Sequence, residues 1–259
     1  MVEAYLARIA AARPARTDAA ALGALQERHL DAVPFENLSI HLGEPIGLAP
    51  DALLDKLVKR GRGGFCYELN GAFALLLEAL GFTVTRLSAR VFDPEGALGP
   101  PFDHLALRVD LAEPMLVDVG FGSLARRPLR LDARDEQADA AGSFRLREAP
   151  YGDLDVLMDG TPRYRLEMRP RDLTDFAPTC WWQQTSPDSH FTQSLTCSLP
   201  TPAGRVTLSG HRLFRTEHGR RTETGLGSDR DVLDAYRDLF GISLETVPAD
   251  PRRTRPATA

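Results

Sequence analysis

Cys66, His104 and Asp118 follow one another along the chain, and these residue types could together carry out nucleophilic acyl transfer. Cys66 comes directly after the glycine-rich run 60–64 and Phe65, at the start of a stretch with helical spacing. A thiol in the first turn of a helix lies at the positive end of the helix dipole, which favours the thiolate. The glycines would let backbone N–H groups approach a substrate oxygen closely. For Cys66 taken alone, the alternative is a buried structural cysteine.

A thiol nucleophile needs a base and a group that orients the base, and His104 and Asp118 suit these two roles. Both lie in alternating apolar and polar segments, which are separated by a turn near residues 112–114. In a hairpin centred on residue 111 the two side chains would be directly opposite, and in one centred on residue 112 they would be diagonal neighbours. A centre between two residues would place them on opposite faces. Asp118 needs such a partner, because an unpaired carboxylate in an apolar strand is costly.

The composition argues against several other kinds of chemistry. The 259 residues carry a formal net charge of -5, so we expect no nucleic-acid partner. Lys56 and Lys59 are the only lysines, which disfavours a Schiff-base mechanism, and both are expected on the solvated face of a short helix. The cysteines are three in number and show no C-x-x-C spacing, so neither a disulfide framework nor a zinc knuckle fits.

A zinc site made from Cys66, His104 and Asp118 is an alternative on residue type alone. It lacks a local chelating pair such as H-x-x-x-H, so we expect no metal. The other two cysteines are predicted to be packing residues. Cys180 precedes two tryptophans, and Cys197 lies in an apolar stretch.

The first 81 residues are predicted to form helices. Thr17 is expected to cap one helix and Asp51 to begin another. From Phe65 the apolar residues again follow helical spacing, and Gly81 is suited to end that helix as a left-handed cap. Cys66 is therefore expected in the first turn of a buried helix.

Beyond residue 81 the pattern changes to the alternation typical of strands. Strands are predicted at 82–87, 105–109, 115–121, 163–168, 191–199 and 205–208, and the polar segment 132–149 is predicted to be a loop. Ser228 is expected to cap a helix over 229–240 that Gly241 ends. The tail, 250–259, is rich in arginine and proline and is expected to fray. Helices followed by antiparallel strands and a mixed end predict an α+β fold.

We expect no targeting or membrane-spanning segment. Residues 1–12 lack a basic start followed by an apolar run, and the longest apolar run, 72–77, is far below the roughly 18 residues of a membrane helix. The expected location is the reducing cytoplasm, which suits free thiols.

Four blocks of the sequence resemble the arylamine N-acetyltransferase family. The blocks are Val33-Pro34-Phe35-Glu36-Asn37-Leu38 with Ile40-His41, Arg62-Gly63-Gly64-Phe65-Cys66-Tyr67-Glu68-Leu69-Asn70-Gly71, His104-Leu105 with Val117-Asp118-Val119-Gly120-Phe121-Gly122, and Gln184-Thr185-Ser186-Pro187-Asp188-Ser189-His190-Phe191. The resemblance extends over about residues 33–244. One R-G-G-x-C run would be weak evidence, whereas four blocks in order and with matching spacing are strong evidence.

The resemblance implies a fold of three parts with a cysteine-protease-like catalytic core. These are an N-terminal helical bundle carrying the nucleophile (1–81), a central antiparallel β-barrel carrying the histidine and aspartate (82–190), and a C-terminal α/β lid (191–259). It also implies a ping-pong reaction without a metal. Acetyl-CoA would acylate Cys66, and an arylamine, arylhydrazine or arylhydroxylamine would then take the acetyl group.

The resemblance further assigns roles around the triad of Cys66, His104 and Asp118. Phe35 and Phe121 would line the acceptor pocket, where aromatic faces suit aryl substrates. Phe191 would lie near the cleft for coenzyme A. Arg62 and Glu36 would form a structural ion pair that anchors the catalytic loop. For the two pocket phenylalanines, plain core packing is the alternative.

Three other functions stay open from the residues. A homologous amide synthase would use the same triad to release a polyketide by macrolactam formation. A cysteine peptidase or a transglutaminase-like enzyme would pass the acyl group to another acceptor, which for a peptidase is water. In a binding module without activity, Cys66, His104 and Asp118 would be structural.

Overall fold

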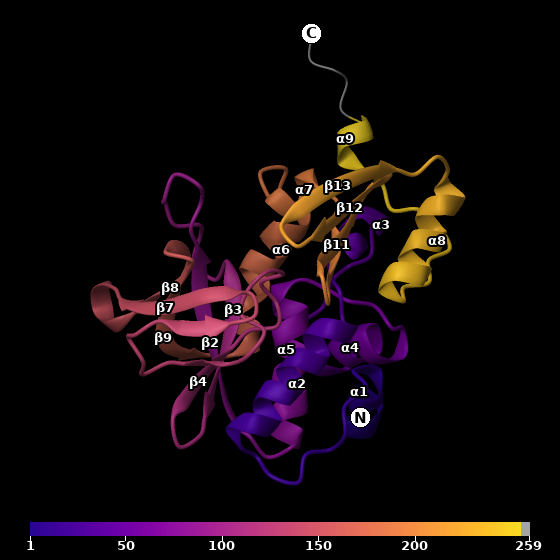
Figure 1. Ribbon diagram of the computed structural model, residues 1–259. Helices are drawn as coiled ribbons and strands as arrows, with labels where there is room; N and C mark the ends of the chain where they lie inside the picture. Colours follow the sequence, from indigo (N-terminus) through magenta and orange to yellow (C-terminus); the bar gives the residue numbers. More distant parts are fainter. Residues whose placement is uncertain (255–259) are drawn as a thin grey trace.

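The computed structural model describes residues 1–254, with side chains to residue 252. The α-helices are α1 (Val2–Arg8), α2 (Ala19–Ala32), α3 (Leu38–Leu42), α4 (Pro50–Leu54), α5 (Cys66–Ala79), α6 (Ala177–Thr185), α7 (His190–Gln193), α8 (Asp229–Phe240) and α9 (Pro251–Thr254). A π-helix, η1 (Asp55–Lys59), and two 3-10 turns, η2 (Pro150–Gly152) and η3 (Leu173–Phe176), complete the helical segments. Figure 1 shows α1, α2, α4 and α5 gathered in one layer at the N-terminal side of the molecule.

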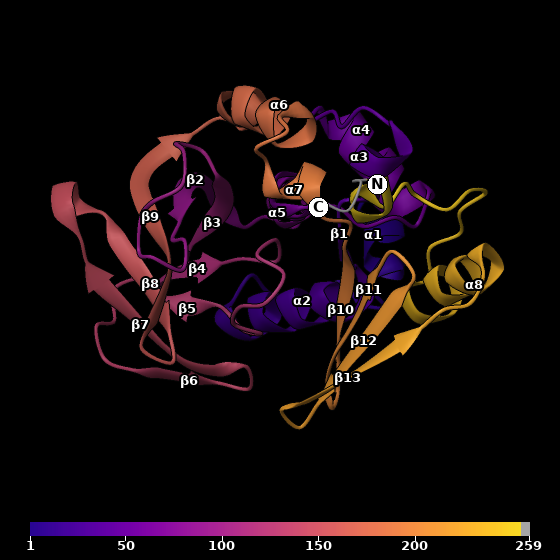
Figure 2. The same ribbon diagram turned by 90° about the horizontal axis from the view of Figure 1, so that it is seen from above.

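The strands form two antiparallel sheets. They are β1 (Phe35–Glu36), β2 (Thr83–Val91), β3 (His104–Asp110), β4 (Pro114–Val117), β5 (Leu129–Arg130), β6 (Gln137–Asp139), β7 (Gly142–Glu148), β8 (Leu154–Met158), β9 (Thr161–Arg171), β10 (Cys197–Thr201), β11 (Gly204–Ser209), β12 (Arg212–Glu217) and β13 (Arg220–Gly225). The larger sheet has the order β5-β4-β3-β2-β9-β8-β7-β6, and the smaller has the order β1-β10-β11-β12-β13. Figure 2 shows the two sheets on opposite sides of the molecule, with α5 and α7 between them.

The larger sheet curls into a nearly closed barrel. Its edge strands β5 and β6 do not pair in the described residues, but the Gln137 side chain joins them. The Gln137 amide accepts a hydrogen bond from the Arg130 N–H at 2.8 Å and donates one to the Arg130 carbonyl at 3.1 Å. The Gln137 side chain thus supplies hydrogen bonds to backbone groups of the edge strand β5 that would otherwise have no partner in the sheet.

Helix α5 is the central element of the fold. Its residues Cys66–Ala74 are all buried, and it packs against α1 and α4 and against strands β2 and β3. Gly81 follows the helix with a φ of +96°, and its N–H bonds to the Glu78 carbonyl, as expected of a left-handed cap. The predicted position of Cys66 is confirmed, because it is the first residue of this buried helix.

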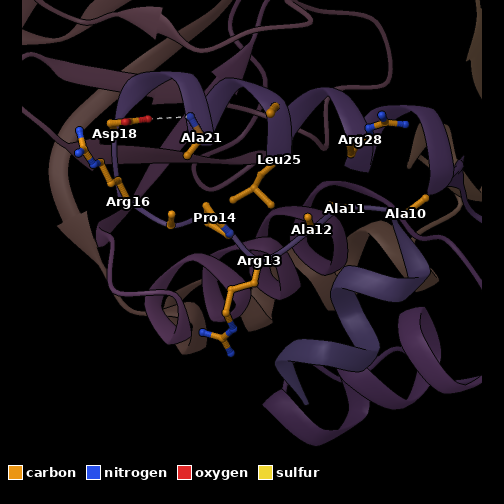
Figure 3. Close-up of a pocket in the computed structure, with 12 residues that line it drawn as sticks. Ala10, Ala11, Ala12, Arg13, Pro14, Arg16, Asp18, Ala21, Leu25 and Arg28 are labelled. Atoms are coloured by element: carbon orange, nitrogen blue, oxygen red, sulfur yellow. Dashed lines mark hydrogen bonds between the residues drawn. The ribbon is translucent and has the colours of Figure 1, made fainter.

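The cap of α2 differs from the prediction. Asp18, rather than Thr17, is its N-cap residue, and the Asp18 carboxylate accepts a hydrogen bond from the Ala21 N–H at 2.9 Å. Figure 3 shows this bond at one end of a hollow of about 600 Å³ between α2 and the loop that precedes it. Adjacent cap-forming residues explain the error, since either side chain could serve and only the backbone path selects one.

Three strand and loop predictions are corrected. The segment 132–149 contains the hairpin of β6 and β7, because Phe144 and Leu146 alternate inward among polar residues that diluted the signal. The segment 191–199 begins in α7, since the Ser189 hydroxyl accepts a bond from the Phe191 N–H and starts a helical turn. Strand β4 ends at Val117, so residues 118–121 have left the sheet.

The smaller sheet is covered on one face by α8. Ser228 caps this helix and Gly241 ends it with a φ of +66°, as predicted. Its apolar stripe of Val232, Tyr236 and Phe240 packs with Leu208 of β11. Because β1 comes from the N-terminal third and pairs with β10, the sheet also ties the two ends of the chain together.

The division into parts at residues 81 and 190 stays a prediction. The last part of the predicted frayed tail, residues 255–259, lies outside the described residues. No helix within residues 1–254 is long and apolar enough to cross a membrane.

His29 should make the fold sensitive to acid. It is fully buried between Tyr5, whose hydroxyl is 3.2 Å from Nδ1, and the ring of Phe73. Burial, together with the positive charge of Arg8, lowers the pKa of His29 to about 3. The unfolded chain binds this proton near pH 6.5, so between these values it holds more protons than the folded chain. We expect His29 to reduce the free energy of unfolding by roughly 1.4 kcal/mol per pH unit as the pH falls through this window.

The measurement is denaturant unfolding at several pH values between 6.5 and 4.5. The variant His29→Gln should lose part of the pH slope, because glutamine can still bond to Tyr5 but does not titrate. The matched control is His218→Asn, on an exposed turn, which should keep the slope of the parent. Equal slopes for His29→Gln and the parent would contradict this assignment.

Candidate active site

Cys66 lies where the helical bundle meets the barrel. It is 3% exposed, and its sulfur is 3.9 Å from the Asp103 carbonyl and also faces the Leu105 N–H. The thiol thus contacts the backbone on both sides of His104. As the first residue of α5, Cys66 has an N–H group with no acceptor in a preceding helical turn. That N–H is free to donate to a carbonyl bound at the sulfur.

The segment before Cys66 is held by pairing with the segment before α3. The Glu36 N–H donates to the Gly64 carbonyl at 2.9 Å, and the Gly64 N–H donates to the Pro34 carbonyl at 3.4 Å. At Gly63 the approach is so close that a Cβ would lie 1.9 Å from the Pro34 carbonyl oxygen. Only glycine fits there, which gives the glycine-rich run a steric purpose.

A buried network of charges supports the same segment. The Arg62 guanidinium bonds to Glu36 at 3.0 Å, so the predicted partners do meet. Lys56, expected on a solvated face, is instead 8% exposed and bonds to Glu68 at 2.7 Å. The reason is that η1 turns it inward, toward two buried carboxylates that need a positive charge. Glu68 also accepts a bond from the Phe65 N–H, and so fixes the start of α5.

His104 and Asp118 meet by the diagonal register. Strands β3 and β4 pair Leu107 with Val117 and Asp110 with Pro114, so the hairpin is centred on residue 112. The His104 Nε2 and the Asp118 Oδ2 are 2.7 Å apart, and both side chains are buried. Since Nε2 is engaged by Asp118, Nδ1 is the ring nitrogen left without a bond to the carboxylate.

The Asp118 carboxylate is fully satisfied by donors. Its Oδ1 accepts bonds from the Asn70 side-chain amide and from the Gly120 N–H, both at 2.9 Å. Burial alone would raise the pKa of Asp118, but these donors and His104 hold that pKa below its ordinary value. Asp118 is therefore ionised and available to stabilise a positive charge on His104.

The turn after Asp118 packs closely against Cys66. A Cβ at Gly120 would lie 2.7 Å from the Cys66 Cα and 2.6 Å from the Asn70 Nδ2. The absence of a side chain thus lets the barrel approach α5 closely enough for the three groups to converge.

The electrostatics of Cys66 differ from the expectation based on the helix dipole. Burial raises the pKa of the Cys66 thiol well above its ordinary value, and the negative charges of Asp103 and Asp118 act in the same direction. The hydrogen bond from the Leu105 N–H lowers the pKa of the thiol, but by less than burial raises it. The thiol therefore needs a base to become nucleophilic, and the helix N-terminus alone does not suffice.

Three phenylalanines surround the site. The rings of Phe35 and Phe191 have centroids 6.2 Å apart, and both pack beside the buried cluster that contains Cys66. Phe121 stands edge-on to the His104 ring at 5.2 Å and lies 5.3 Å from the buried ring of Tyr164. The structure thus brings all three predicted pocket residues to the triad.

A cavity of about 910 Å³ opens beside Asp118 and Phe121. Its walls come from the loop that follows β4, from the barrel and from the β10–β11 turn of the smaller sheet. Among the described residues, no group of three or more His, Cys, Asp or Glu side chains is arranged to hold a metal ion.

The geometry agrees with known proteins. A family model described as N-acetyltransferase matches residues 18–248. The arylamine N-acetyltransferase of Mycolicibacterium smegmatis is 37% identical over 252 residues, which cover 93% of this chain and 91% of that protein. This chain belongs to the arylamine N-acetyltransferase family. It is thus an enzyme of an acyltransferase family.

Solved arylamine N-acetyltransferase structures share the fold. The enzyme from Salmonella typhimurium superposes with a TM-score of 0.87 at 30% identity, covering 95% of this chain and 92% of that one. The Mycobacterium marinum enzyme, solved in complex with CoA, superposes with a TM-score of 0.84 at 32% identity and covers 93% of each chain. The predicted α+β fold of helical bundle, barrel and lid is confirmed.

Sequence reasoning missed the supporting role of Asn70. Its amide bonds to Asp118, to the Leu105 carbonyl at 2.6 Å and to the Val119 N–H at 2.9 Å. A signal was present, because Asn70 lies four residues after Cys66 and so shares its helix face. A polar amide on such an apolar helix requires buried partners.

Proposed function

We propose that this chain transfers the acetyl group of acetyl-CoA to the nitrogen of an arylamine, arylhydrazine or arylhydroxylamine. Cys66 is the nucleophile, His104 the acid and base, and Asp118 the group that orients His104. The observation that carries the proposal is the buried 2.7 Å contact between His104 and Asp118, one residue away from the backbone groups that touch the Cys66 sulfur. Family membership supports the choice of donor and acceptor.

In the first half-reaction Cys66 gives its proton to His104 Nδ1, and the thiolate attacks the acetyl carbonyl carbon. The negative charge on the carbonyl oxygen is met by backbone donors at the start of α5, of which the Cys66 N–H is the first. The C–S bond to coenzyme A then breaks, and the departing sulfur takes the proton back from His104. Asp118 offsets the positive charge that His104 carries in between.

In the second half-reaction the amine nitrogen attacks the acetyl carbon of acetyl-Cys66. His104 accepts the proton that the nitrogen loses, the C–S bond to Cys66 breaks, and His104 passes the proton to the released sulfur. The products are the N-acetylated acceptor and the free thiol. Phe35 and Phe121 offer aromatic faces to the acceptor ring, and Phe191 lies on the side of the coenzyme.

A second cavity of about 590 Å³ supports binding of coenzyme A. It begins at Phe35 and extends over the face of the smaller sheet that α8 leaves uncovered. Arg212, Arg221 and Arg252 line it, and the Arg221 guanidinium lies 4.2 Å from the Phe214 ring centroid. Guanidinium groups beside an aromatic face suit the phosphates and the adenine of the coenzyme.

A reducing compartment such as the cytoplasm suits this chemistry. Cys66, Cys180 and Cys197 are all free and buried. Oxidation of Cys66 would remove the proposed nucleophile. The amide synthase considered above receives no support from the comparisons.

The test is mass spectrometry of the protein after exposure to acetyl-CoA alone. We expect a gain of one acetyl group, located on the peptide that contains Cys66. Addition of an arylamine should remove it and yield one N-acetyl product for each acetyl group lost. A folded protein that gains no acetyl group, or that gains it elsewhere, would refute the proposed mechanism.

A further inference from the structure

Arg205 extends from β11 into the cavity of about 910 Å³ that Asp118 and Phe121 also line. It is half-buried, and its Nη1 donates a hydrogen bond to the Ser198 hydroxyl at 2.9 Å. This is the only hydrogen bond of the guanidinium among the described residues, although the group has five N–H donors. Among the side chains that the structure describes, no carboxylate pairs with Arg205.

The other charged groups around the cavity are already matched. Arg126 bonds to Asp31, and Asp118 is engaged by His104. Burial, and then the positive charge of Arg126, lowers the pKa of Arg205. A guanidinium stays protonated even when its pKa is lowered, so Arg205 carries its charge where a second positive charge is near and, among the described residues, a counter-charge is missing.

A half-buried cation in this setting loses hydration without gaining a counter-charge. An anion bound in the cavity would supply that partner and would use the free donors of the guanidinium. The end of strand β10 adds Thr201 to the lining and strand β12 adds Thr216, and threonine hydroxyl groups can bond to the same anion.

We propose that this cavity binds the acyl acceptor and that Arg205 selects acceptors carrying a carboxylate. The proposal rests on the proposed function and adds to it the chemical class of the acceptor. An aromatic acid with an amino group would place its ring against Phe121, its nitrogen toward the triad and its carboxylate toward Arg205.

A phosphate of coenzyme A is the other anion that could bind to Arg205. The structure favours the acceptor, because three other arginines line the separate cavity beside Phe35. Phe35 lies between the two cavities, since its ring is 3.4 Å from where a Cβ of Gly122 would be, and Gly122 lines the cavity of Arg205.

The first experiment uses the unaltered enzyme. The kcat/KM is measured for 4-aminobenzoate, for its methyl ester and for aniline, with acetyl-CoA saturating. We expect 4-aminobenzoate to be preferred over the ester by about tenfold or more, because a charge-assisted hydrogen bond is lost with the ester. The preference should weaken in high salt. No preference for the acid would overturn the proposal.

The second experiment compares Arg205→Gln and Arg205→Lys with the control Arg215→Gln. Arg215 is exposed on the neighbouring strand β12 and lines neither cavity. We expect Arg205→Gln to raise the KM for 4-aminobenzoate about tenfold while the KM values for aniline and acetyl-CoA stay within about twofold. Arg205→Lys, which keeps the charge, should restore part of the affinity, and Arg215→Gln should behave as the parent.

The outcomes distinguish an acceptor carboxylate from a coenzyme A phosphate as the anion that binds Arg205. They also distinguish failure of the role of Arg205 from failure of the proposed acetyl transfer. A higher KM for acetyl-CoA, with no change for S-acetyl-N-acetylcysteamine, which lacks phosphates, would assign Arg205 to the coenzyme and overturn its role toward the acceptor. Equal effects on 4-aminobenzoate and aniline would also overturn it. Acetylation of Cys66 and transfer to aniline test the proposed function independently of Arg205.

Discussion

Replacing Cys66 with serine should reduce acetyl transfer to arylamines by about 10⁴-fold or more. A serine hydroxyl is a far weaker nucleophile than a thiolate, and the surrounding negative charges oppose its ionisation as they oppose that of the thiol. The site gives Cys66 an unfavourable environment for the thiolate, so the proposed reaction depends on proton transfer to His104. Serine does not make that transfer easy, because its proton is held more tightly.

The measurement is release of free coenzyme A with an arylamine present, together with the mass of the protein after acetyl-CoA alone. The matched control is Cys180→Ser, another buried thiol, where the new hydroxyl can still accept the bond from the Gln184 amide. The control should keep most of the activity. If Cys66→Ser retained more than about a hundredth of the parent rate while folded, the nucleophile would have to lie elsewhere.

Replacing Asp118 with asparagine should lower kcat by about 10⁴-fold while preserving the fold. The Asn70 amide and the Gly120 N–H both donate to Oδ1, so the new side chain must keep its oxygen there and place its NH2 toward His104. That NH2 donates, so His104 Nε2 would have to accept. The imidazole proton would then be on Nδ1, where it blocks transfer from Cys66. The variant would also lose the charge that stabilises protonated His104.

Three measurements separate this effect from unfolding. Thermal unfolding should show a folded protein, nitrogen-15 NMR of the imidazole should show the changed tautomer, and KM for acetyl-CoA should change much less than kcat. The control Asp110→Asn alters a surface carboxylate on strand β3 that pairs, within the described part of the chain, with Arg108 alone. It should leave kcat nearly unchanged. Unchanged activity in Asp118→Asn would exclude Asp118 from the orienting role.

Much of the active site could be predicted because its constraints are local. The position of Cys66 followed from glycine spacing and an apolar helix, both of which operate within a few residues. The meeting of His104 and Asp118 followed from a short hairpin, in which only a few registers exist. The strand alternation restricted these registers further, since the chosen register had to bury Leu107 and Val117.

Most of the predictions that were wrong depended on contacts between distant segments. Lys56 is buried because Glu36 and Glu68, from two other elements, need its charge. The β6–β7 hairpin forms because β7 pairs with β8 and buries Phe144, although most of the segment is polar. Phe191 belongs to a helical turn because Ser189 caps it and because Asn37 binds the carbonyl of Phe191 from the other end of the chain.

The sequence by itself identified the family, predicted Cys66, His104 and Asp118 as the triad, and indicated most of the order of helices and strands. Periodicity and motif spacing encode these features, and each is established by short-range sterics and burial. Three features were decided only by the tertiary structure. They are the diagonal register of the β3–β4 hairpin, the unmatched charge of Arg205 in the cavity, and the buried contacts that support the site, made by Asn70, Gly120, Glu68 and Lys56. These depend on which surfaces meet after folding, since burial and the sum of nearby charges are set by the whole chain.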